Sequence, residues 1–346
     1  MKILQVIDTL NVGGAEKVFV DICNILNENQ VDVSALFILK GGVLQDKIKS
    51  GILIYELNRK SRWNIRAMYQ CSLMITKFDI IHCHSSHVYR YIKLVSRLFF
   101  LEKLKIVFQD HNGIINVNKK IPLFFNSILK PEYYIGVSDV LVQWGINQLK
   151  IDKEQCFLLE NIIVRDVLYD LSVKKKKYDL ILVSNIKTNK NQLFGIQLAN
   201  RLNKSMLLVG KIQDDKYNDL LHNSINIGDK TIQFDYEINE VQRILKDAKI
   251  GLHTSLYETG PLVLIEYLAQ GLPFLSYDTG EVANILKPYF PEFFIDNFEI
   301  EQWEERINLL LSRKPEIDKM NEVFEKKFGK QQYFNKLKHI YQCIKN

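Results

Sequence analysis

The sequence predicts an α/β protein with two doubly wound, Rossmann-like domains that face each other across a cleft. Three observations support this fold class. The length of 346 residues suits two domains of ordinary size. Short apolar runs typical of buried strands alternate with helical patterns in both halves of the chain. The alternation stops in a polar, lysine-rich stretch and then starts again, which places the domain boundary there.

The first half contains seven apolar runs that we expect to form parallel strands. They cover residues 3–7, 33–39, 52–57, 80–83, 106–109, 134–137 and 157–159. Helical patterns follow the first three runs, over residues 16–28, from Leu44 onward and over 65–76. Strands that alternate with helices in this way form a parallel sheet covered on both faces, so residues 1–165 are predicted to be one Rossmann-like domain.

The second half repeats the pattern. Expected strands cover residues 179–184, 205–209, 232–234, 250–254 and 273–276, and expected helices cover 192–202, 216–223, 238–247 and 262–270. Residues 166–178, with four consecutive lysines at 174–177, read as an exposed linker. The second domain is then 179–325. The tail has apolar residues at helical spacing, and we expect one or two amphipathic helices, with 326–346 packing back on the first domain.

Composition favours a reduced, cytoplasmic setting. The chain is 47% hydrophobic and 25% charged, it begins directly with a strand pattern, and its five cysteines are scattered. The formal charge is uneven, because residues 1–165 carry 21 Lys+Arg against 15 Asp+Glu whereas the rest carries 25 of each. We expect the basic half to meet an anionic surface or acceptor, although solvated surface lysines would give the same count. The excess is small and no nucleic-acid reader motif is present, so no nucleic-acid partner is predicted.

The most informative segment runs from Ser255 to Pro273. Glu258 and Glu266 stand eight residues apart around Gly260 and Pro261. Pro261 is favoured at the first position of a helix, and Gly271 ends it. The free amides of that first turn, together with the positive end of the helix dipole, suit a phosphate or diphosphate. A helix-capping role would explain Glu258 alone, but it would not explain both acids.

This segment resembles the E-x7-E block of retaining glycosyltransferase family 4, which has the GT-B fold, and Gly271-Leu-Pro273 resembles the Gly-x-Pro that follows the block. The resemblance extends over nearly the whole chain. It implies that Glu266 binds the ribose hydroxyls of a nucleotide-sugar and that Glu258 faces the sugar near its anomeric carbon. The amides of Gly260 and Leu262 would then hold the diphosphate.

Two positions in the first half also match the family. Gly14, in Asn11-Val-Gly-Gly-Ala-Glu16, resembles the glycine-rich turn after the first strand, where a missing side chain lets the backbone approach the donor. His111, in Phe108-Gln-Asp-His-Asn-Gly113, resembles the strand-end histidine that approaches the transferred sugar or its phosphate. A plain βα turn and a structural histidine are the alternative interpretations.

Lys190 stands where the family has a lysine that neutralises the donor diphosphate. Asn185 replaces the arginine usually found a few residues earlier, and Lys187 is a candidate for the second cation at a different spacing. No Asp-x-Asp metal site is present, so cations and helix amides must offset the charge of the departing diphosphate, and neither a metal nor a cofactor is predicted. The cluster His82-Cys-His84-Ser-Ser-His87 is too sparse in ligands to predict zinc.

The sequence therefore predicts a retaining glycosyltransferase that moves a sugar from a nucleotide-sugar donor to a hydroxyl of a glycan or lipid-linked acceptor, in bacterial surface polysaccharide synthesis. The main alternative is a catalytically weak GT-B binding or scaffold subunit. An NAD-dependent oxidoreductase is disfavoured because the first turn lacks G-x-G-x-x-G.

Peripheral contact with the inner face of a membrane is a further expectation. Residues 89–100 and 119–125 both mix cations with aromatic residues, which suits an anionic bilayer. The alternative is that Tyr91, Leu94, Val95 and Leu98 belong to a helix that faces the core.

Overall fold

The computed structural model describes residues 1–11, 13–61, 63–101, 103–111, 129–165, 176–225, 231–237 and 240–345. The chain forms two compact units. Unit 1 comprises Met1–Ile162 and Lys330–Asn346, and unit 2 comprises Ile163–Gly329. Most of the predicted linker, residues 166–175, lies outside the described residues.

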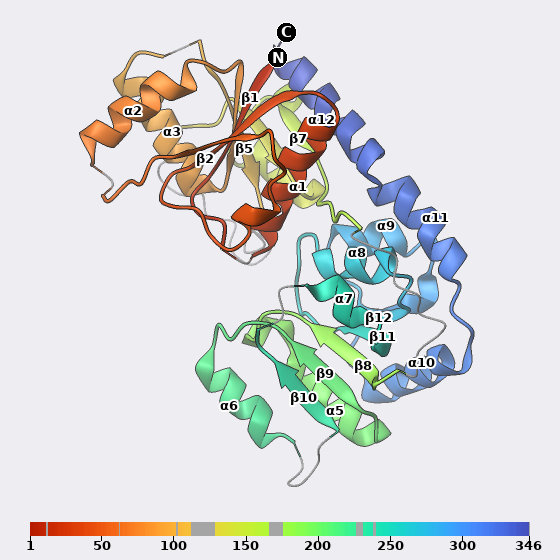
Figure 1. Ribbon diagram of the computed structural model, residues 1–346. Coiled ribbons are helices and arrows are strands. Elements are labelled where there is room, and N and C mark those ends of the chain that lie inside the picture. Colours follow the sequence, from red (N-terminus) through yellow and green to blue (C-terminus); the bar gives the residue numbers. More distant parts are fainter. Residues whose placement is uncertain are drawn as a thin grey trace. The chain divides into compact units, whose positions relative to one another are not determined.

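Unit 1 is built on a seven-stranded parallel sheet in the order β3-β2-β1-β4-β5-β6-β7 (Figure 1). The strands are β1 (Lys2–Ile7), β2 (Asp32–Phe37), β3 (Leu53–Glu56), β4 (Ile80–His84), β5 (Lys105–Asp110), β6 (Tyr133–Gly136) and β7 (Cys156–Leu158). Ile3 pairs with Val33 on one side and with Ile80 on the other, so β1 and β4 are neighbours although two strands separate them in sequence. The strand order reverses between β1 and β4, which is the switch point where ligands bind in open α/β sheets.

The helices of unit 1 are α1 (Gly14–Glu28), α2 (Ile65–Ile75), α3 (Ser86–Leu98), α4 (Asp139–Asn147) and α12 (Lys330–Lys345). The helix predicted from Leu44 is wrong. Only a three-residue 3-10 turn, Gln45–Lys47, forms there. The chain must reach β3 within a few residues, and Gly51 turns it with a φ of +97° that a continuing helix would not allow.

Unit 2 is built on a six-stranded parallel sheet in the order β10-β9-β8-β11-β12-β13. The strands are β8 (Tyr178–Val183), β9 (Met206–Val209), β10 (Ile232–Asp235), β11 (Ala248–His253), β12 (Phe274–Tyr277) and β13 (Phe294–Ile295). The helices are α5 (Gln192–Leu202), α6 (Asp215–Asn223), α7 (Val241–Leu245), α8 (Leu262–Ala269), α9 (Glu281–Leu286), α10 (Ile300–Ser312) and α11 (Ile317–Phe328). The order again reverses once, here between β8 and β11.

Helix α8 is apolar on nearly all sides because it is covered on more than one side. It contacts β11 as well as helices α7, α9 and α11. Six of its eight residues are buried, and Glu266 is its one charged residue. A helix with so little polar surface is stable only inside a domain, so the block that begins at Leu262 is held firmly in unit 2.

The predicted amphipathic tail forms two helices that lie in different units. Helix α11 contacts α8 in unit 2, whereas α12 contacts α1 in unit 1 (Figure 1). Helix α12 buries Leu337, Tyr341 and Ile344. Its Lys336 forms an ion pair with Glu160 at 2.8 Å. Helix α12 is therefore part of the core of unit 1, and it brings the buried hydroxyl of Tyr341 to the sheet of that unit.

Candidate functional site

The candidate site of unit 2 lies on the loops that follow β8, β11 and β12. The first carries Lys190, the second carries Glu258 and the third carries Thr279. Since β8 and β11 are the strands at which the order reverses, the first two loops leave the sheet at its switch point. Parallel strands end on the same edge, which brings together side chains that are 68 residues apart in sequence.

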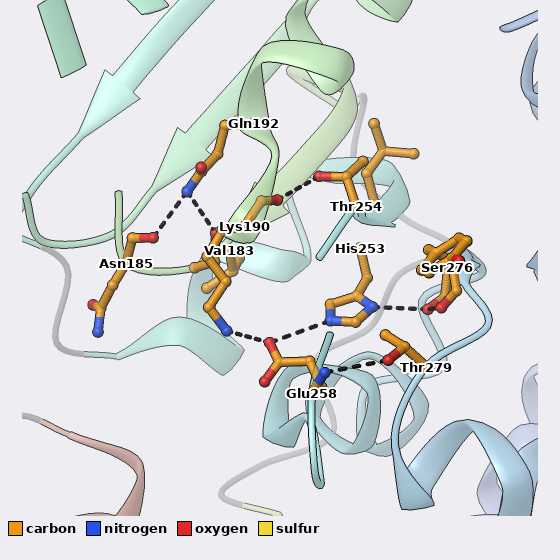
Figure 2. Close-up of polar contacts among 12 residues, drawn as sticks. Val183, Asn185, Lys190, Gln192, His253, Thr254, Glu258, Ser276 and Thr279 are labelled. Carbon is orange, nitrogen blue, oxygen red and sulfur yellow. Dashed lines mark hydrogen bonds and ion pairs between the residues drawn. The ribbon is translucent and has the colours of Figure 1, made fainter. Parts of the chain in front are cut away.

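Glu258 is the centre of a small charged cluster (Figure 2). The ammonium of Lys190 donates to its Oε1. The Nε2 of His253, at the end of β11, lies 3.7 Å from the same oxygen. The other ring nitrogen of His253, Nδ1, is 2.8 Å from the hydroxyl of Ser276 on β12. The side chains of Lys190 and Glu258 are only 16% and 17% exposed, so the pair is largely removed from water.

The surroundings keep Glu258 ionised. Burial works to raise the pKa of its carboxyl group, but the ring of His253 beside it and the positive charge of Lys190 outweigh burial and lower the pKa to about 2. Burial also lowers the pKa of His253, and Glu258 opposes this shift only in part. At neutral pH the cluster is therefore a carboxylate paired with an ammonium and oriented by a neutral imidazole.

Backbone contacts hold the two loops together. The hydroxyl of Thr254 donates to the carbonyl of Lys190 at 2.9 Å, and the amide of Leu256 donates to the carbonyl of Asn189 at 2.9 Å. Both contacts join the loop after β8 to the loop after β11. They fix where Lys190 leaves the backbone, so its side chain is positioned before any ligand arrives.

The third loop supports Glu258 from the other side. The amide of Glu258 donates to the hydroxyl of Thr279 at 3.2 Å. Gly280 has a φ of +85°, and a Cβ atom there would lie 2.8 Å from Cδ of Pro261 and 3.2 Å from Cβ of Glu258. A side chain at Gly280 would therefore push directly on the segment that carries the carboxylate.

The predicted helix after Gly260 is present, but Pro261, expected at its first position, lies just before it. Leu262 is its first residue and Pro261 is its N-cap, because ψ of Pro261 is 107° and therefore extended. The amides of the first turn have no acceptor one turn earlier in the helix, and that of Leu264 donates to the carbonyl of Pro261 at 3.3 Å. Glu266 lies one turn further and is 6% exposed. Residues four apart share one face of a helix, so Glu266 lies on the same face of α8 as Leu262.

Asn185 and Lys187 differ in their surroundings. Asn185 supplies its backbone carbonyl, which accepts a hydrogen bond from Gln192 at 2.9 Å (Figure 2). The side chain of Lys187 is on the same loop as Lys190. Burial and the charge of Lys190 lower its pKa, while Glu258 raises it. Lys187 therefore lies in the electrostatic field of the cluster, and it can supply the cation that the sequence lacks at Asn185.

The residues predicted in unit 1 lie at the switch point of the other sheet. Gly14 is the first residue of α1, directly after the loop from β1, and it is exposed. His87, in the first turn of α3 after β4, forms an ion pair with Asp8 at 3.2 Å. Gly13 is the N-cap of α1, so both glycines lie at the start of the helix that follows β1.

His111 follows β5 and ends a stack of three imidazole rings, which we call the histidine column: His82, His84 and His111. The ring centroids are 4.6 Å apart in the first pair and 5.5 Å apart in the second. His84 bonds to His111 at 3.3 Å through Nδ1 and to Oε1 of Gln5 at 2.9 Å through Nε2. Gln5 in turn donates to the hydroxyl of Tyr341, which lies 2.7 Å from Nδ1 of His82.

Burial keeps the histidine column uncharged. It lowers the pKa of His82 to about 3 and that of His111 to about 4, and it holds the pKa of His84 well below its ordinary value. The rings of His82 and His84 are thus engaged in hydrogen bonds within the core. No group of three or more His, Cys, Asp or Glu residues in the described part of the chain could hold a metal ion.

Sequence reasoning missed His253, Ser276, Thr279 and Gly280. A signal was available for the first, because His253-Thr-Ser255 is a polar triplet directly after a buried apolar strand. Ser276 lies on the next strand, β12, and Thr279 and Gly280 follow it, so their relevance depends on β12 lying beside β11.

Comparison with known proteins agrees with this architecture. Residues 169–327 match the family model described as glycosyl transferases group 1. HepE of Anabaena, in complex with UDP and glucose, has a similar structure, with a TM-score of 0.79, 15% identity, and coverage of 99% of each chain. A glycosyltransferase from Rickettsia africae gives a TM-score of 0.77 with 18% identity, over 99% of this chain and 98% of that one.

The chain has the GT-B fold and is a glycosyltransferase. The predicted fold class, α/β with two Rossmann-like domains, is thereby confirmed. The lipopolysaccharide outer core galactosyltransferase WaaB is a third similar structure, with a TM-score of 0.67, 16% identity and coverage of 99% of each chain. A search for relatives among curated proteins found no match.

Proposed function

We propose that this glycosyltransferase is a retaining enzyme of family 4 that transfers a sugar from a nucleotide-sugar to a hydroxyl of a glycan or lipid-linked acceptor. The observation that carries the proposal is the Lys190–Glu258 pair beside the N-terminus of α8. It places a cation, a carboxylate and a set of helix amides at one edge of the sheet of unit 2. These are the groups needed to hold a diphosphate and a sugar next to each other.

Each group has a distinct task in the proposed reaction. Lys190 holds the diphosphate together with the amide of Gly260, just before the helix, and that of Leu262, its first residue. Glu258 accepts hydrogen bonds from hydroxyls of the transferred sugar, and Glu266 accepts them from the ribose. We assign His111 and Gly14 of unit 1 to the approach to the sugar and its phosphate.

The chemical step breaks the bond between the anomeric carbon and the phosphate oxygen and forms a bond to the acceptor oxygen on the same face of the sugar. The acceptor proton passes to the departing phosphate oxygen, so no covalent enzyme intermediate is required. Charge builds up on the leaving diphosphate in the transition state. Lys190 is already in place to stabilise it, with Lys187 as a second cation.

The donor and the setting are inferred from the similar structures. Structures of HepE contain UDP and UDP-glucose, which makes UDP-sugars the first donors to test. WaaB is named for lipopolysaccharide outer core synthesis, and we propose a comparable role in bacterial surface polysaccharide synthesis. We place the protein in the cytoplasm, in peripheral contact with the inner face of the membrane. No helix among the described residues is long and apolar enough to cross a membrane.

The test is a donor screen followed by product analysis. Thermal shifts with UDP-, GDP- and ADP-sugars select the donor, and NMR of the product gives its anomeric configuration. Glu258→Ala is expected to abolish transfer, while Glu301→Ala, which removes an exposed carboxylate of α10, leaves it intact. Unimpaired transfer by Glu258→Ala would refute the site assignment. Donor binding without any turnover would instead favour the binding-subunit alternative.

We also propose that the enzyme needs no metal. Transfer is then expected to continue in EDTA at an undiminished rate, because cations of the protein replace the metal at the diphosphate. Loss of activity in EDTA that Mg²⁺ or Mn²⁺ restores would contradict this proposal.

A further inference from the structure

Unit 1 exposes six large apolar side chains on α2, on the segment before it and at the end of α3. We call this set the aromatic strip. Its members, with their exposed fractions, are Trp63 (77%), Ile65 (75%), Tyr69 (53%), Leu73 (53%), Leu98 (52%) and Phe100 (86%). Single exposed apolar residues are ordinary, but a group of this size with two aromatic rings nearly free of contacts indicates an interaction surface.

Three members of the strip share one face of α2, and one of them contacts the end of α3. Ile65, Tyr69 and Leu73 are spaced four residues apart, so they lie on one face of α2, opposite to the buried Ala67, Met68 and Cys71. The ring of Tyr69 lies 6.0 Å from that of Phe99, at the end of α3, which joins the two helices. Leu98 and Phe100 flank Phe99 in the chain. All six side chains of the strip remain more than half exposed.

The chain segments that carry the strip are strongly basic. Residues 57–78 contain five Lys or Arg and no Asp or Glu, and residues 85–105 contain five Lys or Arg and one Glu. Lys60, Arg66, Arg97 and Lys103 are exposed. Apolar side chains bordered by cations are complementary to a surface that is apolar inside and anionic outside.

We propose that the aromatic strip docks unit 1 onto an anionic lipid bilayer, with Trp63 and Phe100 inserted at the headgroup level and the neighbouring cations on lipid phosphates. A second copy of this chain is a poorer occupant, because two such faces would bring an excess of positive charge together. This inference gives the membrane contact of the proposed function a defined surface, and vesicle binding itself does not depend on the transfer reaction.

A basic cavity of about 280 Å³ lies beside one end of the strip. Its cations are Lys93 and Arg97 of α3 together with Lys130 and Lys150, and its acids are Glu132 and Asp152. Burial and the charge of Arg97 lower the pKa of Lys93, which shows that the cations are crowded. Arg97 precedes Leu98, so a docked bilayer places lipid phosphates next to this cavity.

The surface differs from the one expected from sequence. Tyr89 and Tyr91 are buried in the core of unit 1, so most of the segment 89–100 serves the core, and only its end, at Leu98 and Phe100, belongs to the strip. The segment 119–125 lies outside the described residues. The exposed apolar face of α2 was not predicted, because the pattern over residues 65–76 was interpreted only as a helix that covers the sheet.

Tryptophan fluorescence gives a direct test. Trp63 is exposed, whereas Trp144 and Trp303 are 6% and 0% exposed, so a change on vesicle binding reports on Trp63. Vesicles of phosphatidylcholine with about one third phosphatidylglycerol are expected to shift its emission to the blue, and brominated acyl chains are expected to quench it. Pure phosphatidylcholine is expected to bind much less, and 1 M salt is expected to weaken binding to the anionic vesicles.

Variants identify the surface by co-sedimentation. Trp63→Ser and Phe100→Ser are each expected to weaken binding to anionic vesicles about tenfold, since each removes a large apolar side chain from the bilayer. Val140→Ser is the matched control, because Val140 is 48% exposed on α4 of the same unit, and it is expected to bind as the wild type does.

Three results would overturn the inference: no binding to anionic vesicles, equal binding by the wild type and both strip variants, or a dimer in sedimentation velocity that Trp63→Ser dissociates. Hydrolysis of the donor in lipid-free solution is measured for the same variants and is expected to be unchanged. Failure of the membrane surface is thereby distinguished from failure of the proposed enzyme activity.

Discussion

Replacing Glu258 with glutamine removes one negative charge while keeping the size of the side chain. In the structure this charge holds the ammonium of Lys190, and both side chains are about one-sixth exposed. A diphosphate that binds Lys190 must therefore compete with Glu258. Glu258→Gln is expected to tighten the binding of free UDP. The ammonium of Lys190 is released from its pair, and a negative charge that would repel the diphosphate is gone.

The size of this effect follows from the burial of the pair. Two unit charges ~4 Å apart interact by ~1 kcal/mol in water and by ~4 kcal/mol at an effective dielectric constant of ~20. Exposed pairs contribute less than ~1 kcal/mol after side-chain ordering. For a largely shielded pair we take about 1.4 kcal/mol, which corresponds to an approximately tenfold lower Kd for UDP.

For a ligand that carries the sugar, the same substitution also removes a favourable contact and so weakens binding. If Glu258 accepts hydrogen bonds from the transferred sugar, the loss of its charge costs about 1.5 kcal/mol for UDP-glucose and nothing for UDP. The release of Lys190 affects both ligands equally. The ratio of the Kd for UDP-glucose to the Kd for UDP is therefore expected to rise about tenfold in Glu258→Gln.

Isothermal titration calorimetry with both ligands measures this ratio. Glu301→Gln is the control, because it removes a carboxylate that is 69% exposed on α10, and it should leave both constants unchanged. An unchanged ratio would refute the contact between Glu258 and the sugar. Weaker binding of UDP by the variant would refute the competition for Lys190.

Three further predictions concern the supports of the two units. Gly280→Ala is expected to lower kcat and to reduce the free energy of unfolding by about 1–3 kcal/mol. The reason is that Gly280 has a φ of +85° and that the new Cβ atom would press on the loop that carries Glu258. A fully active, equally stable variant would contradict this. Tyr341→Phe is expected to destabilise unit 1 by about 2–4 kcal/mol in urea unfolding, since two buried hydrogen bonds lose a partner. Tyr91→Phe, whose hydroxyl bonds to no described residue, should cost nearly nothing, and equal losses in both variants would refute the argument. The histidine column stays neutral in the folded state, whereas the same three histidines protonate near pH ~6.5 in the unfolded chain. The free energy of unfolding of unit 1 should therefore fall as the pH drops below ~6.5. The loss is up to ~4 kcal/mol per pH unit, because unfolding takes up three protons. Trp144 fluorescence, which reports on unit 1, should then show unfolding at a higher pH than Trp303 fluorescence, which reports on unit 2, and coincident transitions would count against it.

Much of the fold was predictable because the signals are local. The helix predicted over 192–202 has the same bounds in the structure, and the strand predicted over 3–7 is present as Lys2–Ile7. In both cases apolar spacing and turn residues act within a few positions of one another. The segment from Leu44 was mispredicted because its composition permits a helix and only the position of the next strand excludes one.

The candidate site was predictable only in part. The spacing of Glu258 and Glu266 around Gly260 and Pro261 is local, and it survives in the structure, with Pro261 lying just before the helix. The partners of Glu258 were not predictable in the same way. Lys190 was proposed from resemblance, for a different contact, and His253 was not proposed at all.

By itself, the sequence determined the class of fold, the helix with an amide-rich start and the two carboxylates beside it, because propensity, capping and periodicity operate over a few residues. Only the tertiary structure decided that Lys190 holds Glu258, that Gly280 supports it from the next loop, and that Tyr341 reaches the histidine column. These contacts depend on which strands lie side by side and on which helix covers them. The burial of a whole domain fixes that order, and no short stretch of sequence encodes it.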